Sequence, residues 1–257
     1  MKKKIFYFLI SLLIILCVIF LSIKGPRYTG TGYLITEEKI LNYIKITEFY
    51  ERHKNYKKLV KKINANNKKK DEQIINISKW VYENIKKISN NDTVIDSHPW
   101  TIVERRRGTI DQFSDILSVL LTHNNVESFF NINLNDTSHP FTFFKYNGAW
   151  SIIDPYYGVY FLNKKNQFCN MYEHKYKKCT LYHLDYGEIT NEQLNKIYFD
   201  KKFENMNNFN AYYNFLLKNL NKFEKIDETS VYDRGGRSYI QKPIHRLIFQ
   251  IRNVISD

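Results

Sequence analysis

The sequence predicts an α+β fold in which helices pack on an antiparallel sheet, behind an N-terminal transmembrane helix. Three observations predict this arrangement. Residues 5–23 form an apolar run without charge, apolar residues recur at helical spacing in residues 74–88 and 110–121, and alternating segments flank an Asn-Gly pair within residues 141–154. Spacings of three and four residues indicate amphipathic helices, and alternation around Asn-Gly is the strongest short-range signal of a β-hairpin.

The composition is that of a packed domain with a basic surface. The chain has 257 residues, of which 43% are hydrophobic and 16% aromatic, which suits one main domain rather than a disordered chain. Its formal net charge of +13 favours acidic partners such as anionic glycans or lipid head groups. No recognisable nucleic-acid-binding motif accompanies this charge, so we expect no nucleic acid among the partners.

The N-terminal run, IFYFLISLLIILCVIFLSI, decides the expected compartment. Its 19 uncharged residues, at about 1.5 Å per residue in a helix, match the hydrocarbon thickness of a membrane. The run is longer than the apolar part of a signal peptide and lacks a small-residue cleavage site, so residues 1–25 are predicted to be an uncleaved signal anchor. Lysines at positions 2–4 favour a cytoplasmic N-terminus. We therefore expect a single-pass protein whose domain is extracytoplasmic, on the periplasmic side of a bacterial inner membrane.

The segment between the anchor and the core is expected to be a linker followed by a helical region. Residues 25–32 (GPRYTGTG) have the composition of a juxtamembrane linker. Residues 36–62 carry a mixed pattern that we interpret as helical, and a polar break follows at residues 64–71. We assign residues 26–70 to this linker and lead-in region, and residues 71–165 to the core.

The core is predicted to contain two helices, a strand and the hairpin. Residues 74–88 form the first amphipathic helix, which the turn-forming run at residues 89–92 ends. The second helix carries an apolar face over residues 110–121, and residues 129–134 alternate like a strand.

The register of the hairpin places two polar side chains on one face. If Asn147 and Gly148 form the loop, Asp154 lies opposite Phe141, and His139 becomes its diagonal neighbour, roughly 7 Å away at the backbone. A carboxylate beside an imidazole fixes its tautomer and raises its basicity, as in a catalytic triad. A structural His–Asp hydrogen bond at a strand end is the alternative interpretation.

Cysteines and histidines follow the hairpin in a C-x4-H-x4-C-x3-H pattern, formed by Cys169, His174, Cys179 and His183. These residue types are zinc ligands, but the usual C-x2-C knuckle is missing and the expected compartment is oxidising. We expect a disulfide between Cys169 and Cys179, worth about 2–3 kcal/mol, and no metal. Zinc binding and free thiols are the alternatives.

Residues 166–257 are predicted to be a mostly helical C-terminal extension. Residues 203–223 are rich in asparagine and aromatic residues and are interpreted as helical. The segment at residues 243–255 packs on the core or lies on a membrane surface, because one stripe of it carries Ile244, Leu247, Ile248, Ile251 and Ile255.

Three stretches of the core occur in an order that is characteristic of one superfamily. They are WTIVERRRGTIDQFSDILSVLL, the strand with His139, and the strand WSIIDP. Together they resemble the transglutaminase-like superfamily of papain-like folds, in which a Trp-containing approach leads to Gly-x-Cys at a helix start, then a His on a strand and an Asp-Pro ending the next strand. The resemblance covers roughly residues 71–161, and the matching positions are Trp100, Gly108, His139, Trp150, Asp154 and Pro155.

The resemblance implies Cys-His-Asp chemistry for amide hydrolysis or acyl transfer, yet the nucleophile is missing. Ile110 occupies the position of the cysteine. Thr109 and Gln112 have the spacing of a capping box, so the Thr109 oxygen is expected to accept a backbone N–H rather than to attack a substrate. Ser114 lies a turn deeper and Asp111 faces another direction, so neither is expected to replace the thiol.

We therefore expect a non-catalytic binding or scaffolding module of the cell envelope, in which a cleft beside the remnant dyad of His139 and Asp154 holds a peptide or glycan. The expected ligand-binding residues are Trp100, Arg107 and Trp150, although a solvated turn also accounts for the arginine. The alternative is an amide hydrolase or acyltransferase with an unidentified nucleophile, His139 as base and Asp154 as its orienting carboxylate. No cofactor is expected. The expected partners are the membrane, through the N-terminal helix, and an acidic glycan, a peptide or an envelope protein.

Overall fold

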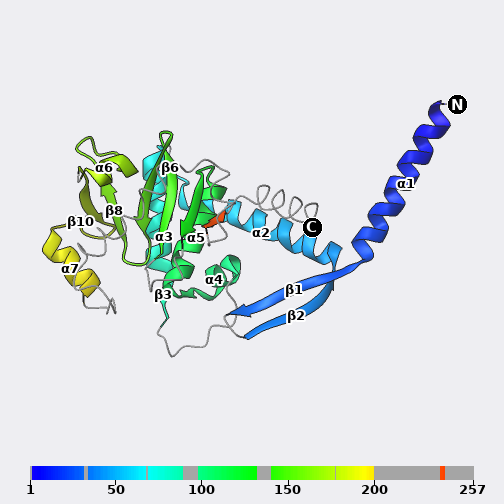
Figure 1. The fold of residues 1–257 in the computed structure, drawn as a ribbon, viewed down its shortest axis with the longest axis horizontal. Coiled ribbons are helices and arrows are strands. Elements are labelled where there is room, and N and C mark those ends of the chain that lie inside the picture. The colour runs from blue at the N-terminus through cyan, green and yellow to red at the C-terminus, as the bar shows by residue number, and fades with distance from the viewer. Residues whose placement is uncertain are drawn as a thin grey trace.

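The computed structural model describes residues 2–31, 34–67, 69–88, 98–131, 140–176, 178–199 and 238–240. Their helices are α1 (Lys2–Ser22), α2 (Asn42–Ile63), α3 (Lys70–Asn84), α4 (Pro99–Arg105), α5 (Ile110–His123), α6 (Met171–Lys175) and α7 (Asn191–Phe199). Their strands are β1 (Lys24–Thr31), β2 (Leu34–Leu41), β3 (Lys86–Lys87), β4 (Arg107–Gly108), β5 (Ser128–Asn131), β6 (Phe141–Tyr146), β7 (Ala149–Asp154), β8 (Val159–Leu162), β9 (Thr180–His183), β10 (Gly187–Glu188) and β11 (Ser238–Ile240). The predicted α+β class, behind an apolar N-terminal helix, is confirmed (Figure 1).

One antiparallel sheet forms the centre of the domain. Its seven strands follow the order β10-β9-β8-β7-β6-β5-β11, and each neighbouring pair is antiparallel. β9, β10 and β11 lie beyond residue 165 and join the same sheet. In the described part of residues 166–257, short helices alternate with these strands, whereas the sequence had indicated mostly helix.

The β6–β7 hairpin has the predicted register. Tyr146 pairs with Ala149 across a two-residue loop. Both loop residues have positive φ, 49° at Asn147 and 82° at Gly148. A type I′ turn requires this backbone, and asparagine and glycine adopt it most readily. The prediction made from the Asn-Gly pair is therefore confirmed.

The sheet separates two apolar clusters, because successive residues of a strand point to opposite faces. The helix-side cluster joins one face to α2, α3, α4 and α5, and its sheet residues include Phe144 and Ile153. The far-side cluster joins the other face to α6 and α7, and its sheet residues include Phe143 and Ile152. In Figure 1, α6 and α7 lie at the end of the domain that is distant from α1.

Between α1 and the domain, the chain forms a two-stranded ribbon of β1 and β2, which pair antiparallel over eight residues each. Residues 25–31 of the segment interpreted as a juxtamembrane linker therefore lie in a strand, in which β-forming residues such as Tyr28 and Thr29 pair with β2. For the same reason the helix predicted over residues 36–62 begins only at Asn42, after β2 has ended.

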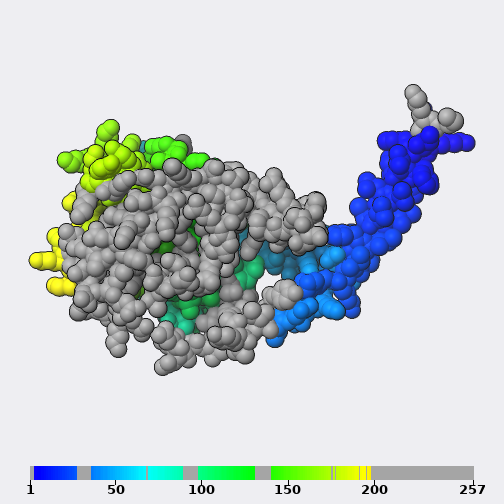
Figure 2. All heavy atoms as spheres, in the orientation of Figure 1, coloured from blue at the N-terminus to red at the C-terminus, as the bar shows by residue number. Residues whose placement is uncertain are grey.

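α1 has the length and composition of a membrane-spanning helix, and among the described residues it alone passes that test. Its apolar side chains are exposed rather than packed on the domain. Figure 2 shows α1 projecting from the body of the protein. This arrangement suits an anchor, because an apolar helix without protein contacts is stable only where another apolar medium covers it.

Several predictions concern residues outside the described part of the chain. Of the strand predicted over residues 129–134, the structure describes the part that belongs to β5. The predictions that lie outside altogether concern the polar run at residues 89–92, His139, the helix at residues 203–223 and the stripe at residues 243–255.

Candidate functional site

The site predicted from the sequence is centred on the start of α5. Ile110 is the first residue of this helix, and the capping box predicted from Thr109 and Gln112 is present. The backbone N–H of Thr109 donates to Gln112 Oε1 at 3.1 Å, and the Thr109 hydroxyl donates to the carboxylate of Asp111. The structure therefore has a capped helix start of the kind that presents a side chain at a helix N-terminus, and the side chain presented is that of Ile110.

The turn before α5 brings several elements into close contact. α4 ends at Arg106, which has a left-handed backbone with φ of 57°. β4 follows and lies parallel to β3, with Lys87 opposite Gly108. A Cβ atom on Gly108 would lie 3.2 Å from Cγ2 of Ile102 and 3.3 Å from Cγ2 of Ile85. Glycine therefore fits here without displacing its neighbours, and a larger residue does not.

The basic run before α5 is tied to its neighbours through Arg105 and Arg106. Arg105 donates through Nη2 to Gln112 Oε1 at 2.7 Å, and through Nε to the carbonyl of Arg107 at 2.8 Å, which fastens the turn to α5. Arg106 donates through Nη1 to Asn84 Oδ1 at 2.9 Å. The side chain of Arg107 is exposed, next to the start of α5. Arg106 and Arg107 are both exposed, and Arg107 is the one nearer in sequence to Ile110.

The side chains around Ile110 leave it in an apolar setting. Ile110 is partly buried and packs against the far-side cluster. Ser114, one turn later, donates through Oγ to the carbonyl of Pro140 at 2.9 Å, and its own carbonyl accepts from the hydroxyl of Thr142. Ser114 thus faces the chain at the start of β6, in agreement with the prediction that it points elsewhere than the position of the nucleophile. Because Pro140 follows His139 in the sequence, the chain directly after His139 lies against α5.

Asp154, at the end of β7, is fully buried (0% exposed). Its Oδ1 accepts the backbone N–H groups of Tyr156 and Tyr157, both at 3.0 Å, so the carboxylate shapes the turn between β7 and β8. Burial, and after it the charge of Asp154, raises the pKa of both tyrosine hydroxyls. These hydroxyls stay protonated at neutral pH. The predicted partner, His139, lies outside the described residues, so the His139–Asp154 dyad stays a prediction.

A cation that sequence reasoning missed lies beside this turn. Lys87 Nζ is 4.5 Å from the ring centroid of Tyr156, 5.2 Å from that of Tyr157 and 5.6 Å from that of Tyr82. Aromatic faces attract an ammonium group at such distances. The sequence shows the two tyrosines that follow Asp154 and Pro155. It gives no sign that Lys87 contacts them, because only the pairing of β3 with β4 brings Lys87 to the start of α5.

β9 brings a histidine to the same region. Val159 pairs with Asp154 on one side and with His183 on the other, so these three residues share one face of the sheet. His183 Nδ1 accepts the backbone N–H of Asp185 at 3.1 Å, and its ring lies 5.4 Å from that of Tyr82. Burial lowers the pKa of His183, so the ring is neutral at pH 7. Sequence reasoning had considered His183 only as a zinc ligand.

The Cys/His pattern divides between two places. The structure joins Cys169 and Cys179 in a disulfide. A ring nitrogen of His174, in α6, lies within 4.8 Å of both sulfur atoms, and burial lowers the pKa of His174 to about 3. His183 lies apart from this group, on β9. Because the two sulfurs are bonded to each other, neither is a thiolate, which is the form that binds zinc.

The three predicted ligand-binding residues do not gather in one place. Trp100, in α4, belongs to the helix-side cluster, with its ring 5.0 Å from that of Tyr56 in α2. Trp150, in β7, belongs to the far-side cluster, with its ring 5.0 Å from that of Phe129. Both tryptophans therefore have packing contacts that explain them, and Arg107 is the member of the set that lies beside Ile110.

Comparison with known proteins gives a partial structural likeness. A provisionally named cysteine protease from Cytophaga hutchinsonii is similar with 18% identity and a TM-score of 0.35, over 40% of this chain and 37% of that chain. A TGase structure has 13% identity and a TM-score of 0.35, over 55% and 46% of the two chains. A provisionally named protease from Parabacteroides distasonis has 12% identity and a TM-score of 0.31, over 65% and 41%. This chain thus covers less than half of each. No protein-family model and no curated protein matches it.

Proposed function

We propose that this protein is a membrane-anchored, non-catalytic module of the cell envelope, which binds a peptide or glycan beside the start of α5. The observation that carries the proposal is the lack of a thiol at that helix start. The proposal also rests on the resemblance of residues 71–161 to transglutaminase-like proteins, whose motif places the nucleophilic cysteine at Ile110.

The three cysteines of the chain are all accounted for. Cys169 and Cys179 form the disulfide, and Cys17 is an exposed residue of α1. α1 projects from the body of the protein, so its thiol does not reach the start of α5 (Figure 2). The positions of the three cysteines therefore support a role that does not depend on a cysteine nucleophile.

Two features of the hydroxyl groups described near Ile110 argue against a nucleophile there. Ser114 donates to the carbonyl of Pro140, and the raised pKa values of the turn tyrosines keep their hydroxyls protonated. Thr109 is the one residue that keeps the enzyme alternative open to test, because its hydroxyl donates to the carboxylate of Asp111. A hydroxyl beside a base is the starting point of nucleophilic catalysis. As the N-cap of α5, however, Thr109 has a structural role that explains the same contact.

The charge around the helix start supports an acidic ligand. Arg107 is exposed beside Ile110, and the ammonium group of Lys87 lies among tyrosine rings on the other side of the β3–β4 pair. The whole chain is basic, with a net charge of +13. Basic groups beside partly buried tyrosine rings suit an acidic peptide or an anionic glycan, since charge attracts the ligand and an accessible ring edge or face can pack against it.

The function is tested with the full chain reconstituted in nanodiscs. We expect a fluorescent polyglutamate peptide or a sulfated oligosaccharide to bind without any product being released. Arg107→Gln should weaken binding about 3–10-fold by removing a charge at the site. Lys165→Gln, which removes an exposed charge from the loop after β8, is the matched control and should leave binding unchanged. If the full chain cleaves or transfers the bound molecule, and Thr109→Val abolishes that activity, the proposal is wrong and the protein is an enzyme.

The location is tested separately. Three lysines before the apolar run favour a cytoplasmic N-terminus, so alkaline phosphatase fused after Asp257 should be active when the protein is made in a bacterial cell. An inactive phosphatase fusion, together with an active cytoplasmic reporter at the same position, would reverse the proposed topology.

A further inference from the structure

The first half of α2 exposes an apolar surface that the domain does not cover. In the second half of the helix, Tyr56 and Val60 are each 5% exposed and belong to the helix-side cluster. In the first half, four large side chains are 49–63% exposed, namely Tyr43, Ile46, Phe49 and Tyr50. Exposed apolar groups gathered in this way mark an interaction surface more often than groups scattered singly do.

The same face of α2 becomes basic further along the helix. Residues three or four apart lie on one face of a helix, and such spacing links Tyr43, Ile46 and Tyr50 to three lysines. The lysines are exposed. We call this surface the outer face of α2, and its residues are Tyr43, Ile46, Tyr50, Lys54, Lys57 and Lys61. An apolar and aromatic stretch followed by lysines is the composition of a helix that lies at a membrane surface.

The start of α2 is attached to the end of α1. The backbone N–H of Asn42 donates to the carbonyl of Ile23 at 2.9 Å, and its side-chain Nδ2 donates to the carbonyl of Phe20 at 3.0 Å. The end of a membrane-spanning helix lies at the boundary between hydrocarbon and water. These two hydrogen bonds therefore place the first turn of α2 at that boundary if α1 crosses the membrane.

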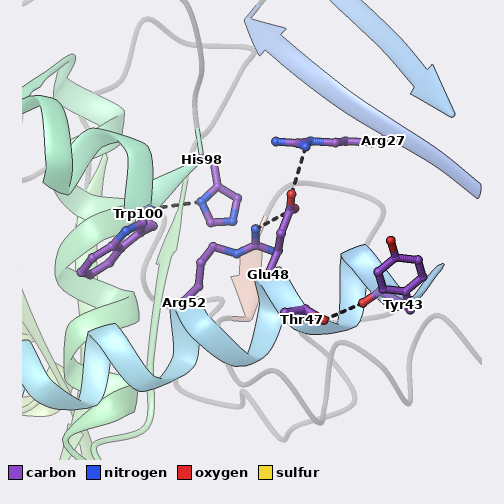
Figure 3. Close-up of polar contacts among 7 residues, drawn as sticks. All are labelled: Arg27, Tyr43, Thr47, Glu48, Arg52, His98 and Trp100. Carbon is purple, nitrogen blue, oxygen red and sulfur yellow. Dashed lines mark hydrogen bonds and ion pairs between the residues drawn. The ribbon is translucent and has the colours of Figure 1, made fainter. Parts of the chain in front are cut away.

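A second set of contacts holds α2 against the ribbon. Arg27 reaches from β1 to Glu48 Oε1 at 3.1 Å, and Arg52 reaches Glu48 Oε2 at 3.4 Å (Figure 3). In Figure 1, α2 runs crosswise to α1. Because the ribbon and α2 are tied both to each other and to the end of α1, a spanning α1 directs α2 along the membrane surface rather than away from it.

We propose that the outer face of α2 lies in the interfacial layer of the membrane that α1 spans. Tyr43, Ile46 and Tyr50 contact the boundary between acyl chains and head groups, and the three lysines contact anionic head groups. The apolar surface of α1 then continues without a break into that of α2. The inference rests on the anchoring role of α1 in the proposed function and adds a second membrane contact, which fixes how the domain faces the bilayer.

The test places a fluorescent label on single cysteines of the full chain. Cys17→Ser removes the exposed native thiol, and non-reducing conditions keep Cys169 and Cys179 bonded. An NBD label is attached to Ile46→Cys in the outer face, to Leu13→Cys in α1, or to Lys165→Cys in the loop after β8. The labelled proteins are reconstituted into vesicles of phosphatidylcholine and phosphatidylglycerol that carry spin-labelled lipids as quenchers.

The expected result is that the label at position 46 is quenched at least about threefold more strongly than the label at position 165. Quenching at position 46 as weak as at position 165, with strong quenching at position 13, would overturn the inference and leave the anchor intact. Weak quenching at position 13 would instead overturn the anchor, and the interfacial helix with it. The two failures are therefore distinguishable.

The lysines are tested by changing the lipid charge. Quenching at position 46 should be stronger in vesicles with phosphatidylglycerol than in phosphatidylcholine alone, because lysines near an anionic surface are attracted to it. Lys54→Gln, Lys57→Gln and Lys61→Gln together should abolish this difference. Three exposed lysines elsewhere serve as the matched control, which should keep it: Lys164→Gln, Lys178→Gln and Lys196→Gln. The role of the outer face would be refuted if the quenching difference between the two kinds of vesicle remained in the triple variant of Lys54, Lys57 and Lys61 and disappeared in the control variant.

Discussion

The two faces of the central sheet differ in what they bury. On the helix side, α5 presents a run of apolar side chains that are fully buried in the helix-side cluster, including Phe113, Ile116 and Leu117. Among the described residues, the buried carboxylate and imidazoles belong to the other face: Asp154 and His183 share that face with Val159, and His174 packs on Phe161. Burying an ionisable group is costly unless the surroundings satisfy it. The helix side therefore buries a mainly apolar core, and the far side buries a carboxylate and imidazoles as well.

The largest effect should come from the helix side. Leu117→Ala removes a side chain with 0% exposure from the middle of α5. Truncation leaves a cavity that the surrounding helices cannot close, so the free energy of unfolding should fall by about 2–5 kcal/mol. Urea denaturation of the protein in detergent, followed by tryptophan fluorescence, measures this loss. A loss below about 1 kcal/mol would mean that α5 does not anchor this core.

The disulfide of the far side should contribute somewhat less. Replacing Cys169 and Cys179 together by serine frees a short loop in the unfolded chain and should lower the free energy of unfolding by about 2–3 kcal/mol. Cys169 donates its N–H to the carbonyl of Phe161, in the far-side cluster. In a double-mutant cycle, the losses in unfolding free energy caused by removing the disulfide and by Phe161→Leu should therefore be non-additive. The losses caused by removing the disulfide and by Leu117→Ala should be additive. Equal coupling to both would show that the sheet does not separate the two clusters.

Acid should weaken the far side through His174. Its pKa is about 3 in the folded protein and 6.5 when unperturbed, because burial disfavours the charged ring. The unfolded chain therefore binds this proton first. The contribution of the neutral ring is fully present above pH 6.5 and is lost as pH falls below it, by about 1.4 kcal/mol per pH unit. His174→Gln removes the titration, so the variant should lose less stability than the native protein between pH 6.5 and 4. Parallel losses would contradict the burial of the neutral ring.

The smallest effect is expected where the two sides meet, at the start of α5. Ile110→Cys in a Cys17→Ser background places a thiol at the first helical residue, where free N–H groups and the helix dipole favour the thiolate. The pKa of the new thiol should fall below 8.5 by up to about one unit. Iodoacetamide should then label it faster at pH 6 than it labels Lys165→Cys, an exposed position. Ordinary or slower labelling would mean that this helix start does not have the geometry of a nucleophile site.

Local sequence signals predicted the parts of the fold that depend on neighbouring residues. Asn147 and Gly148 determine the hairpin register because their positive φ values select one turn type. Thr109 and Gln112 determine the start of α5 because the capping box needs only residues three apart. The contact between Cys169 and Cys179 could be expected from their spacing and compartment, and the structure contains it.

The parts that were missed depend on contacts between distant segments. Residues 25–31 have the composition of a linker because glycine and proline weaken strand propensity, and only pairing with β2 makes them a strand. Lys87 reaches the site because β3 pairs with β4, and no local sequence pattern predicts this pairing. Trp100 and Trp150 matched a family motif but pack in different clusters, so motif order alone did not tell a packing role from a binding role.

The edge strand β11 has a consequence for how the chain is made. β5 pairs with β6 on one side and with β11 on the other, and β11 is formed by Ser238–Ile240, far along the chain from β5. During synthesis, β5 and β6 can therefore pair long before β11 has emerged, and until then the free edge of β5 can pair with strands of other chains. Contacts between such distant segments also form slowly. The newly made domain is thus most prone to aggregate in the interval before its last described strand arrives.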